Sequence, residues 1–433
     1  MKNTSAVIVI SWVMTLLFTH CEKEPEITPP VQVEIPDPNF LAALIDKGVD
    51  VNGDGLIDNV EAEAVLSLDI GGSDISDMTG IEKFINLDTL LCHENQFSTL
   101  DISNLSSLRY LNCAVCELAT LDVSHNTALT WLACHLNQLS VLNISGNPDL
   151  EVIYCHDNNL TALDLSNAPD LRYLMCGENL LTSLDVSGNQ GLSILYCWDN
   201  RITELDITDN PALNDLDIIG NQLTALDVSH NPLLRSLDCG NNQLTSLDVT
   251  RNPVLEHLGF SWNQITEIDL TQNPALYGLQ CIDCGLNNLD LSANLTIGYL
   301  DCSGNQFPSL DVSSNTLLGS LRCSDNQLTT LDISNNTAVT WLDCRGNNLT
   351  TLDVSANTEL VYLWCGGNQL TTLDISSNLA IGSEDSYAEC YLDIAEMPTL
   401  EEVCVWALPF PPDNFRLCME GSPKVQFTTG CSR

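Results

Sequence analysis

The sequence contains few basic residues. Its 433 residues include 14 Lys and Arg against 58 Asp and Glu, which gives a formal net charge of -44 at pH 7. Proteins bind nucleic acid phosphates with clustered cations, so this composition argues against a nucleic acid partner. The same charge disfavours direct adsorption to an anionic membrane surface.

The sequence also lacks an apolar run long enough to span a membrane comfortably. The apolar stretch from Ala6 to Phe18 is too short for that purpose, and Lys2 precedes it. This arrangement matches the basic and apolar regions of a secretory signal. Residues 1–20 are therefore predicted to be a signal peptide.

Catalytic motifs are a third absence. The sequence contains no HExxH, no GxSxG and no phosphate-binding P-loop motif. A glycosidase needs only two carboxylates, but nothing distinguishes two of the many Asp residues from the rest. We therefore expect that the protein is not an enzyme.

A cysteine follows the predicted signal peptide directly. Cys21 resembles the lipid-modified cysteine of bacterial lipoproteins, although His20 replaces the small residue that such sites prefer. Residues 21–38 are expected to form an acidic, proline-rich tether, and the acidic residues just after Cys21 resemble the surface-export signal of Bacteroidota lipoproteins. The resemblance implies a lipid anchor at the outer membrane or cell surface of a Gram-negative bacterium. The alternative is an ordinary cleaved signal peptide and a secreted protein.

A 21-residue unit recurs fourteen times between Leu87 and residue 380. It has the form L-x-x-L-x-C-x-x-N-x-L-T-x-L-D-V-S-x-N-x-x, and its first half is repeated in similar form within its second half. Each L-x-C or L-x-V triplet alternates inward and outward side chains, as a β-strand does. Inward positions stack on their copies in neighbouring coils, so no coil buries its apolar face alone.

This unit resembles leucine-rich repeats, specifically the nested 21-residue IRREKO type that is common in bacterial surface proteins. The resemblance covers roughly residues 66–380. It implies a β-rich repeat solenoid of about fourteen coils, with a parallel sheet on one face and a more ragged strand column on the other. The two Asn columns are expected to hydrogen-bond the backbone at the turns. Residues 39–65 and 381–433 are expected to cap its two ends.

Twelve of the 19 cysteines occupy the sixth, inward position of the unit. A free cysteine there acts as a small apolar residue, so we interpret this column as buried thiols. A disulfide ladder and a metal site are the alternatives. The two CxxC pairs, at 113–116 and 281–284, lie eight coils apart and cannot share a zinc ion. The twelve are Cys92, Cys113, Cys134, Cys155, Cys176, Cys197, Cys239, Cys281, Cys302, Cys323, Cys344 and Cys365.

Four further cysteines lie outside the repeat, at Cys390, Cys404, Cys418 and Cys431. In a secreted chain such a group indicates one or two disulfides that stabilise the C-terminal cap. Three pairings are possible, of which Cys404 with Cys431 is preferred. The alternative is four free thiols.

Residues 50–61 read D-V-N-G-D-G-L-I-D-N-V-E and match the 12-residue calcium loop of an EF-hand. Asp37 and Pro38 are expected to begin a helix before the loop, and a second helix is expected from Asn59 to Val65. We predict calcium as a structural cofactor that secures the N-terminal cap; the alternative is an acidic turn without metal. The predicted ligands are Asp50, Asn52, Asp54, the Leu56 carbonyl, Asp58 and Glu61.

The two outward surfaces of the solenoid differ in composition. The second half of the unit carries Asp in thirteen of fourteen coils and Ser or Thr two residues later, which indicates side chains that cap turns. The first half instead carries five of the seven Trp and seven of the nine Tyr at or beside its outward positions.

Exposed rows of aromatic residues suit the binding of a macromolecule. We expect a monomer that binds a protein or host surface through the concave sheet face. The alternatives are a glycan-binding lipoprotein in carbohydrate uptake, and a structural surface protein whose aromatic residues only shield one another. The predicted ligand-binding face comprises Tyr110, Trp131, Tyr154, Tyr173, Tyr196, Trp198, Tyr299, Trp341, Tyr362 and Trp364.

Overall fold

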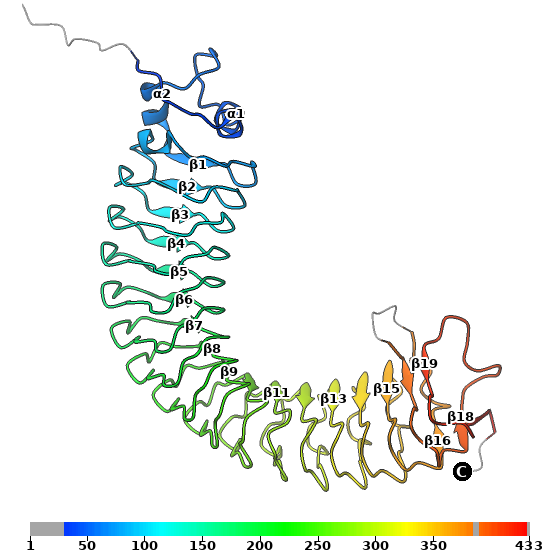
Figure 1. Ribbon diagram of the computed structural model, residues 1–433. Helices are drawn as coiled ribbons and strands as arrows, with labels where there is room; N and C mark the ends of the chain where they lie inside the picture. The colour runs from blue at the N-terminus through cyan, green and yellow to red at the C-terminus, as the bar shows by residue number, and fades with distance from the viewer. Residues whose placement is uncertain (1–29, 384–388, 431–433) are drawn as a thin grey trace, which may run out of the picture.

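The computed structural model of the protein is an arc of stacked coils with two short helices at its N-terminal end (Figure 1). It describes residues 30–383 and 389–430. The predicted signal peptide, Cys21 and Cys431 lie outside the described residues. No helix among the described residues is long and apolar enough to cross a membrane.

The regular elements are short, and almost all are three-residue strands. They are α1 (Pro38–Asp46), α2 (Asn59–Ala64), β1 (Ser67–Asp69), the 3-10 helix η1 (Ile81–Lys83), β2 (Thr89–Leu91), β3 (Tyr110–Asn112), β4 (Trp131–Ala133), β5 (Val152–Tyr154), β6 (Tyr173–Met175), β7 (Ile194–Tyr196), β8 (Asp215–Asp217), β9 (Ser236–Asp238), β10 (His257–Gly259), β11 (Gly278–Gln280), β12 (Tyr299–Asp301), β13 (Ser320–Arg322), β14 (Trp341–Asp343), β15 (Tyr362–Trp364), β16 (Thr372–Asp374), β17 (Leu392–Asp393), β18 (Glu402–Cys404), β19 (Leu417–Cys418) and β20 (Gln426–Thr428).

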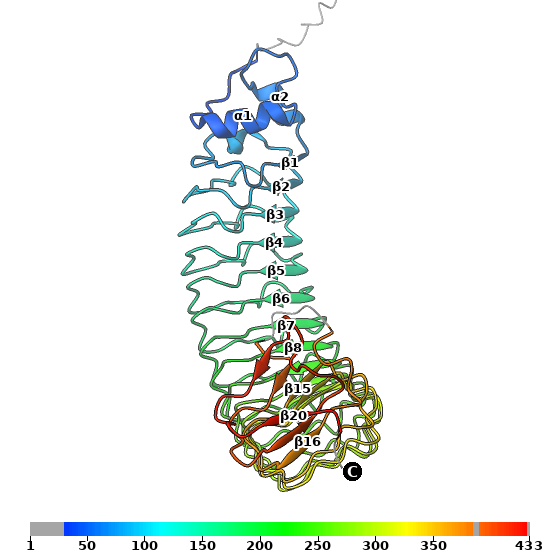
Figure 2. The same ribbon diagram turned by 90° about the vertical axis from the view of Figure 1, so that its right-hand side faces the viewer.

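Seventeen strands form one continuous parallel sheet, which confirms the predicted solenoid. Strands β2 to β15 come from the fourteen repeats and pair in register, so that Thr89 lies beside Tyr110 and Tyr110 beside Trp131. Strand β1 extends the sheet before the repeats, and β17 and β19 extend it after them. Figure 2 shows the strands stacked along one side of the coils.

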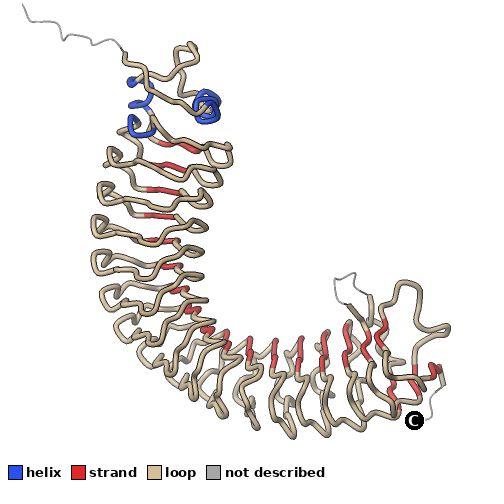
Figure 3. The backbone as a smooth tube through the Cα atoms, in the orientation of Figure 1, coloured by secondary structure: helices blue, strands red, loops and turns tan. Residues whose placement is uncertain are grey.

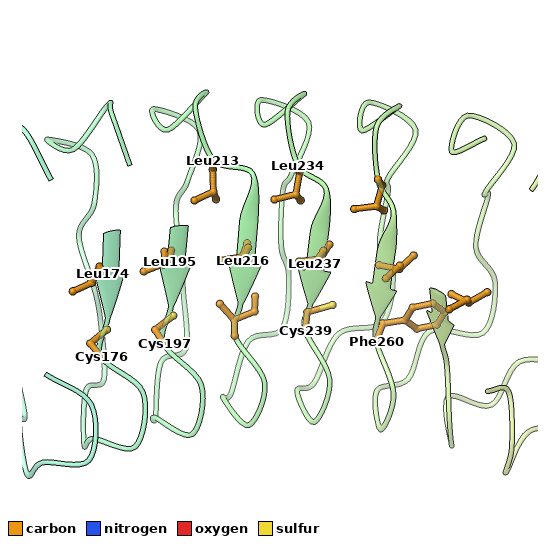
Figure 4. Packing of buried hydrophobic residues seen from close by; sticks show 14 of the residues in the cluster. Leu174, Cys176, Leu195, Cys197, Leu213, Leu216, Leu234, Leu237, Cys239 and Phe260 are labelled. Carbon is orange, nitrogen blue, oxygen red and sulfur yellow. The ribbon is translucent and has the colours of Figure 1, made fainter. Parts of the chain in front are cut away.

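The core between the sheet and the opposite side of the coils is a stack of leucines and cysteines. Leu195 and Cys197 pack on Leu174 and Cys176 of the preceding coil, and all four are fully buried (Figure 4). Phe260 replaces cysteine in one coil and is also fully buried. Because each inward residue packs on its copies, the apolar burial that stabilises a coil comes from its neighbours.

The cysteine column consists of free thiols, as predicted. Burial raises the pKa of the Cys134 thiol to about 12, so this group stays protonated at neutral pH. Since the thiolate is the reactive form, the column packs the core and is chemically inert.

Buried Asn side chains satisfy the backbone at the turn after each sheet strand. Asn158 Nδ2 donates to the carbonyl oxygens of Cys134 and Cys155, at 3.0 and 3.2 Å, and its Oδ1 accepts from Leu139 N at 2.9 Å. The first two acceptors lie in different coils, so the amide joins adjacent coils as well as closing its own turn. This confirms the expected role of the first Asn column.

A second Asn column joins the coils at the opposite turn. Asn147 Nδ2 donates to Val123 O at 3.0 Å and to Asn126 O at 2.8 Å. The same pair of bonds recurs along the column as far as Asn378. Ala168 interrupts the column, and from Asn189 onwards each Asn accepts through its backbone carbonyl from the Asn of the next coil, which makes a ladder.

The second strand column is far less regular than the first. Among the described residues it forms one three-stranded sheet, β16–β18–β20, and two isolated parallel bridges. The large sheet lies on the concave side where the arc bends (Figure 3), so the coils diverge on the convex side and adjacent backbones pair less well. There Asp side chains cap turns as expected: Asp248 Oδ1 accepts from Thr250 N at 2.9 Å.

The N-terminal end of the core is closed by α1 and α2. Asp37 is the N-cap of α1, as predicted, and its Oδ1 accepts from Asn39 N and Phe40 N. Its Oδ2 accepts from the Ser76 backbone and hydroxyl, which ties the helix to the segment that follows β1. Phe40 and Leu44 are fully buried, so α1 contributes directly to the core.

The C-terminal end is held by a disulfide between Cys390 and Cys418, so these two cysteines are not free thiols. This bond links the segment before β17 to β19, where the 21-residue period is lost. Cys404 also takes part in a disulfide. Cys431 lies outside the described residues, so its pairing with Cys404 stays a prediction.

We predict that the folded protein does not react with a thiol reagent at its fourteen described free cysteines, because they are buried. Denaturation without a reductant should make these fourteen thiols reactive, and later reduction should release at least three more, from Cys390, Cys404 and Cys418. Thiol titration measures both steps. A count near zero before reduction would contradict the buried thiol column.

We also predict that Cys116→Asn stabilises the protein. Cys116 Sγ donates to Cys92 O and Ala114 O as an amide would, but it provides no acceptor equivalent to the Asn158 Oδ1 that binds Leu139 N. The corresponding donor, Phe97 N, has no partner among the described residues. Adding this bond should contribute about 1 kcal/mol and raise the thermal unfolding midpoint. Cys113→Asn, at a core position, should lower it; a lower midpoint for Cys116→Asn would refute the assignment.

Candidate functional site

Five aromatic side chains form a row on the outward face of β4 to β7. We name Trp131, Tyr154, Tyr173, Tyr196 and Trp198 the N-terminal aromatic patch. Successive ring centroids are 5.5, 4.9, 5.9 and 6.3 Å apart, so the row is continuous across four coils. All five side chains are partly exposed, so they shield one another and still present surface to a ligand.

The position of Trp198 depends on a glycine in the preceding coil. A Cβ atom on Gly177 would lie 2.3 Å from an indole carbon of Trp198, so a larger residue at 177 would displace this ring. Beyond it, His156 stacks on His135 with centroids 4.3 Å apart, and its ring lies 5.8 Å from Trp198. Burial and the neighbouring His135 lower the pKa of His156 to about 4, so this imidazole is neutral at neutral pH.

The face becomes acidic immediately after this patch. Asp215, Asp217 and Asp238, which we name the acidic segment, lie on β8 and β9, and Asp217 pairs directly with Asp238. Tyr196 donates its hydroxyl to Asp215 Oδ2 at 2.7 Å, so the aromatic and acidic groups are in contact.

The surroundings of the acidic segment disfavour the charged form of its carboxyl groups. Burial, with repulsion from Asp238, Asp215 and Asp199, raises the pKa of Asp217 to about 6. Burial also raises the pKa of Asp238. Within residues 30–383 and 389–430, no ion pair joins any of these three carboxylates to a basic side chain.

A second group of rings, Trp341, Tyr362 and Trp364, lies on β14 and β15 and is named the C-terminal aromatic patch. Trp341 lies 4.5 Å from Tyr362 and 4.9 Å from Trp364, measured between centroids. Tyr362 is only 5% exposed, so its inclusion in the predicted binding face is wrong. Trp341 and the following coil cover it, which sequence position alone does not show.

Arginines of the chain itself cover the C-terminal aromatic patch. The guanidinium carbon of Arg322 lies 4.7 Å from the Trp341 centroid, and that of Arg345 lies 4.4 Å from the Trp364 centroid. Arg345 also donates to both carboxylate oxygens of Asp343, at 2.9 and 2.7 Å, and Arg322 pairs with Asp301 at 3.8 Å. The cation sites on these indoles are therefore occupied within the fold.

The remaining predicted residues lie outside both patches. Tyr110, which is 41% exposed, stands before the first patch beside Arg109, and Tyr299 lies 5.9 Å from Arg322. Trp262 and Tyr277, which are counted at or beside the outward positions but not among the predicted ligand-binding residues, are more exposed, at 54% and 53%. Both residues directly flank outward strand positions, and this sequence pattern already indicated that they would be exposed. The positions of Arg322 and Arg345 over the two indoles were not predicted from the sequence.

The predicted calcium loop lies between α1 and α2, at the end of the arc opposite the C-terminal patch (Figure 1). Gly53 and Gly55 have φ angles of 77° and 80°, a conformation that favours glycine. Asp50 accepts from the backbone N–H groups of both glycines, and Glu61 Oε1 accepts from Val51 N at 2.9 Å.

These side-chain oxygens are gathered within one tight loop, and they are the hard donors that calcium prefers. In the described conformation, however, they cap backbone N–H groups. The part of the chain that the structure describes contains no group of three His, Cys, Asp or Glu side chains positioned to hold a metal ion.

The chain has no match among protein-family models or curated proteins. It is similar to the solved functional domain of InlJ from Listeria monocytogenes, which includes a cysteine ladder. The two are 36% identical, with a TM-score of 0.76, over 83% of this chain and 80% of the InlJ chain.

Two other solved structures share the fold. A leucine-rich-repeat protein of Leptospira interrogans is 24% identical, with a TM-score of 0.68, over 75% of this chain and 90% of that chain. The internalin InlF of Listeria monocytogenes is 21% identical, with a TM-score of 0.64, over 75% and 94%. Together with the identity to InlJ over most of both chains, the 21-residue coils and their cysteine column show that this chain belongs to the bacterial leucine-rich-repeat proteins that include InlJ.

Proposed function

We propose that this protein binds a protein partner through the outward face of its main sheet, with the N-terminal aromatic patch at the centre of the contact. The observation that carries this proposal is the continuous row from Trp131 to Trp198, which stays partly exposed although its rings touch. Tyr and Trp are enriched among the residues that dominate protein interfaces. A rigid sheet also holds them in place before binding, which lowers the entropic cost.

The orientation of the rings favours a protein over a glycan. Stacking on a sugar needs a freely exposed ring face, whereas neighbouring rings in this row are inclined by 52°, 38° and 75°. The row therefore offers edges and grooves to irregular side chains. A glycan-binding role and a purely structural role remain the two alternatives against which the experiment below discriminates.

We further propose that the protein acts at the surface of a Gram-negative bacterium, held by a lipid on Cys21. The support is the sequence of residues 1–38, of which the structure describes only the last nine. An acidic tether would separate the arc from the membrane and leave the concave face free for a partner.

Replacing Trp131 by Ala should weaken binding to the partner at least tenfold, which corresponds to about 1.4 kcal/mol. Trp341→Ala should have a smaller effect, because Arg322 already covers that indole. The partner is first identified by placing a photo-crosslinking phenylalanine analogue at Tyr173 and analysing the crosslinked protein by mass spectrometry. Affinity is then measured with the purified partner.

Leu317→Ala is the matched control, because Leu317 is 61% exposed and lies outside both aromatic patches. It should change the affinity by less than twofold. If both Trp131→Ala and Trp341→Ala leave the affinity unchanged, the aromatic face is not the interface. Crosslinking to no protein, with retention on an oligosaccharide array that Trp131→Ala abolishes, would instead favour the glycan alternative.

We also propose that the loop of residues 50–61 binds one calcium ion. The support is its donor set, with Asp50, Asp54, Asp58 and Glu61 as carboxylates, Asn52 as an amide and Leu56 as a carbonyl. Glycines at positive φ let the backbone turn tightly between these donors. Calcium would offset half of the charge of the four carboxylates and join α1 to α2, which strengthens the cap over the first coil.

Removal of calcium with a chelator should lower the thermal unfolding midpoint by several degrees. At a calcium concentration about 100 times the dissociation constant, binding contributes about 2.7 kcal/mol to the stability of the bound state. Glu61→Gln should abolish the difference between calcium and chelator. Glu63→Gln, on the same helix but outside the loop, should keep it. Equal midpoints for the unmodified protein under both conditions, with no heat of calcium binding, would disprove this proposal.

A further inference from the structure

The two aromatic patches differ in whether the chain supplies its own cations. In the C-terminal aromatic patch, Arg322 and Arg345 lie over the two indoles. In the N-terminal aromatic patch, no Lys or Arg from the described part of the chain lies over any of the five rings. Cationic side chains of the chain therefore cover the rings of the C-terminal aromatic patch but not those of the N-terminal aromatic patch.

The carboxylates beside the two patches differ in the same way. Asp301 and Asp343 are paired with Arg322 and Arg345. The acidic segment beside the N-terminal patch has no such cation among residues 30–383 and 389–430. Aromatic rings next to carboxylates are the combination that the fold itself uses to hold guanidinium groups farther along the same sheet.

The acidic segment is also arranged to accept further hydrogen bonds. Tyr196 binds one oxygen of Asp215, and backbone N–H groups bind one oxygen each of Asp217 and Asp238, at 3.1 and 3.0 Å. The second oxygen of each carboxylate has no hydrogen-bond partner in the described residues. The side chains are thus held in position while one acceptor on each is available.

We propose that the N-terminal aromatic patch and the acidic segment together dock a lysine- and arginine-rich segment of the protein partner. This inference rests on the proposed function and adds the chemistry of the partner to it. Cationic groups would pair with the acidic segment and lie against the aromatic rings, as Arg345 does on Trp364 beside Asp343.

The dimensions and charge of the surface fit such a segment. Strands β4 to β9 span about 24 Å at a strand spacing of about 4.8 Å, which accommodates about seven residues of an extended peptide. The net charge of -44 attracts cationic partners over long range and raises their association rate. Local pairing at the acidic segment would then determine where they bind.

The chain provides a matched control in the Asp column on its other face. Asp248 and Asp269 are exposed and cap turns through Thr250 N and Thr271 N, both at 2.9 Å. Asn143 occupies the same position in another coil and accepts the equivalent bond from Ser145 N. Asn is therefore tolerated there, and changing both Asp residues removes the same charge as changing two residues of the acidic segment.

The experiment measures binding of a fluorescent eight-residue peptide of alternating Arg and Gly to the purified protein by fluorescence anisotropy. A peptide with Glu in place of Arg is the probe of opposite charge and should not bind. Asp217→Asn combined with Asp238→Asn should weaken binding of the Arg peptide at least tenfold. Asp248→Asn combined with Asp269→Asn should change it by less than twofold, and Trp198→Ala should also weaken it.

Thermal unfolding of each variant shows whether it folds, and Asp215→Asn, which keeps an acceptor for Tyr196, is a second variant with the same expected direction. Equal losses in the two double variants would mean that only the overall charge attracts the peptide, and would overturn the proposal. So would the absence of any Arg-peptide binding while the identified partner still requires Trp131; that result would leave the proposed function intact. A partner that is insensitive to both Trp131→Ala and Trp341→Ala would instead refute the proposed function itself.

Discussion

The structure depends on one constraint, which is that every inward side chain must pack on its own copy 21 residues away. Leu195 contacts its equivalents in the coils before and after it, so each coil obtains its core from its neighbours. Phe260 takes the place of cysteine in one coil and is still fully buried. The Asn columns meet the same constraint for polar groups, since Asn158 binds carbonyls in two coils and Asn147 binds two carbonyls of the preceding coil. Outward side chains do not have to pack on their own copies, so these positions can carry function.

Most of the fold was predictable from the sequence because it is periodic. The strand positions, the buried thiols, the role of Asn158 and the N-cap at Asp37 each follow from a rule that one coil or one helix end already contains. The burial of Tyr362 and the stacking of Arg345 on Trp364 were not predictable, because they depend on the side-chain conformations of neighbouring coils. The second strand column is ragged, as expected, but which of its coils still pair depends on the whole arc and not on the repeat.

Curvature also explains why the two faces differ in use. On the concave side the strands stay within pairing distance, so side chains such as Trp131 and Tyr154 touch across coils and form a continuous surface. On the convex side, where the coils diverge, each Asp binds its own turn, as Asp248 does with Thr250. Local capping isolates these carboxylates from one another, whereas pairing on the sheet brings outward groups together. A binding surface built from several coils is therefore favoured on the concave side.

The acidic segment is where these physical requirements conflict. Asp217 and Asp238 are neighbours on adjacent strands, and two unit charges about 4.8 Å apart repel by about 0.9 kcal/mol in water. Partial burial increases that cost, which is why the pKa of Asp217 is raised to about 6. Elsewhere on the same face the fold relieves such charges with Arg322 and Arg345. A solenoid maintained by packing alone gains nothing from leaving Asp217 and Asp238 uncompensated, whereas a surface that receives a cationic partner gains the binding energy that their pairing releases.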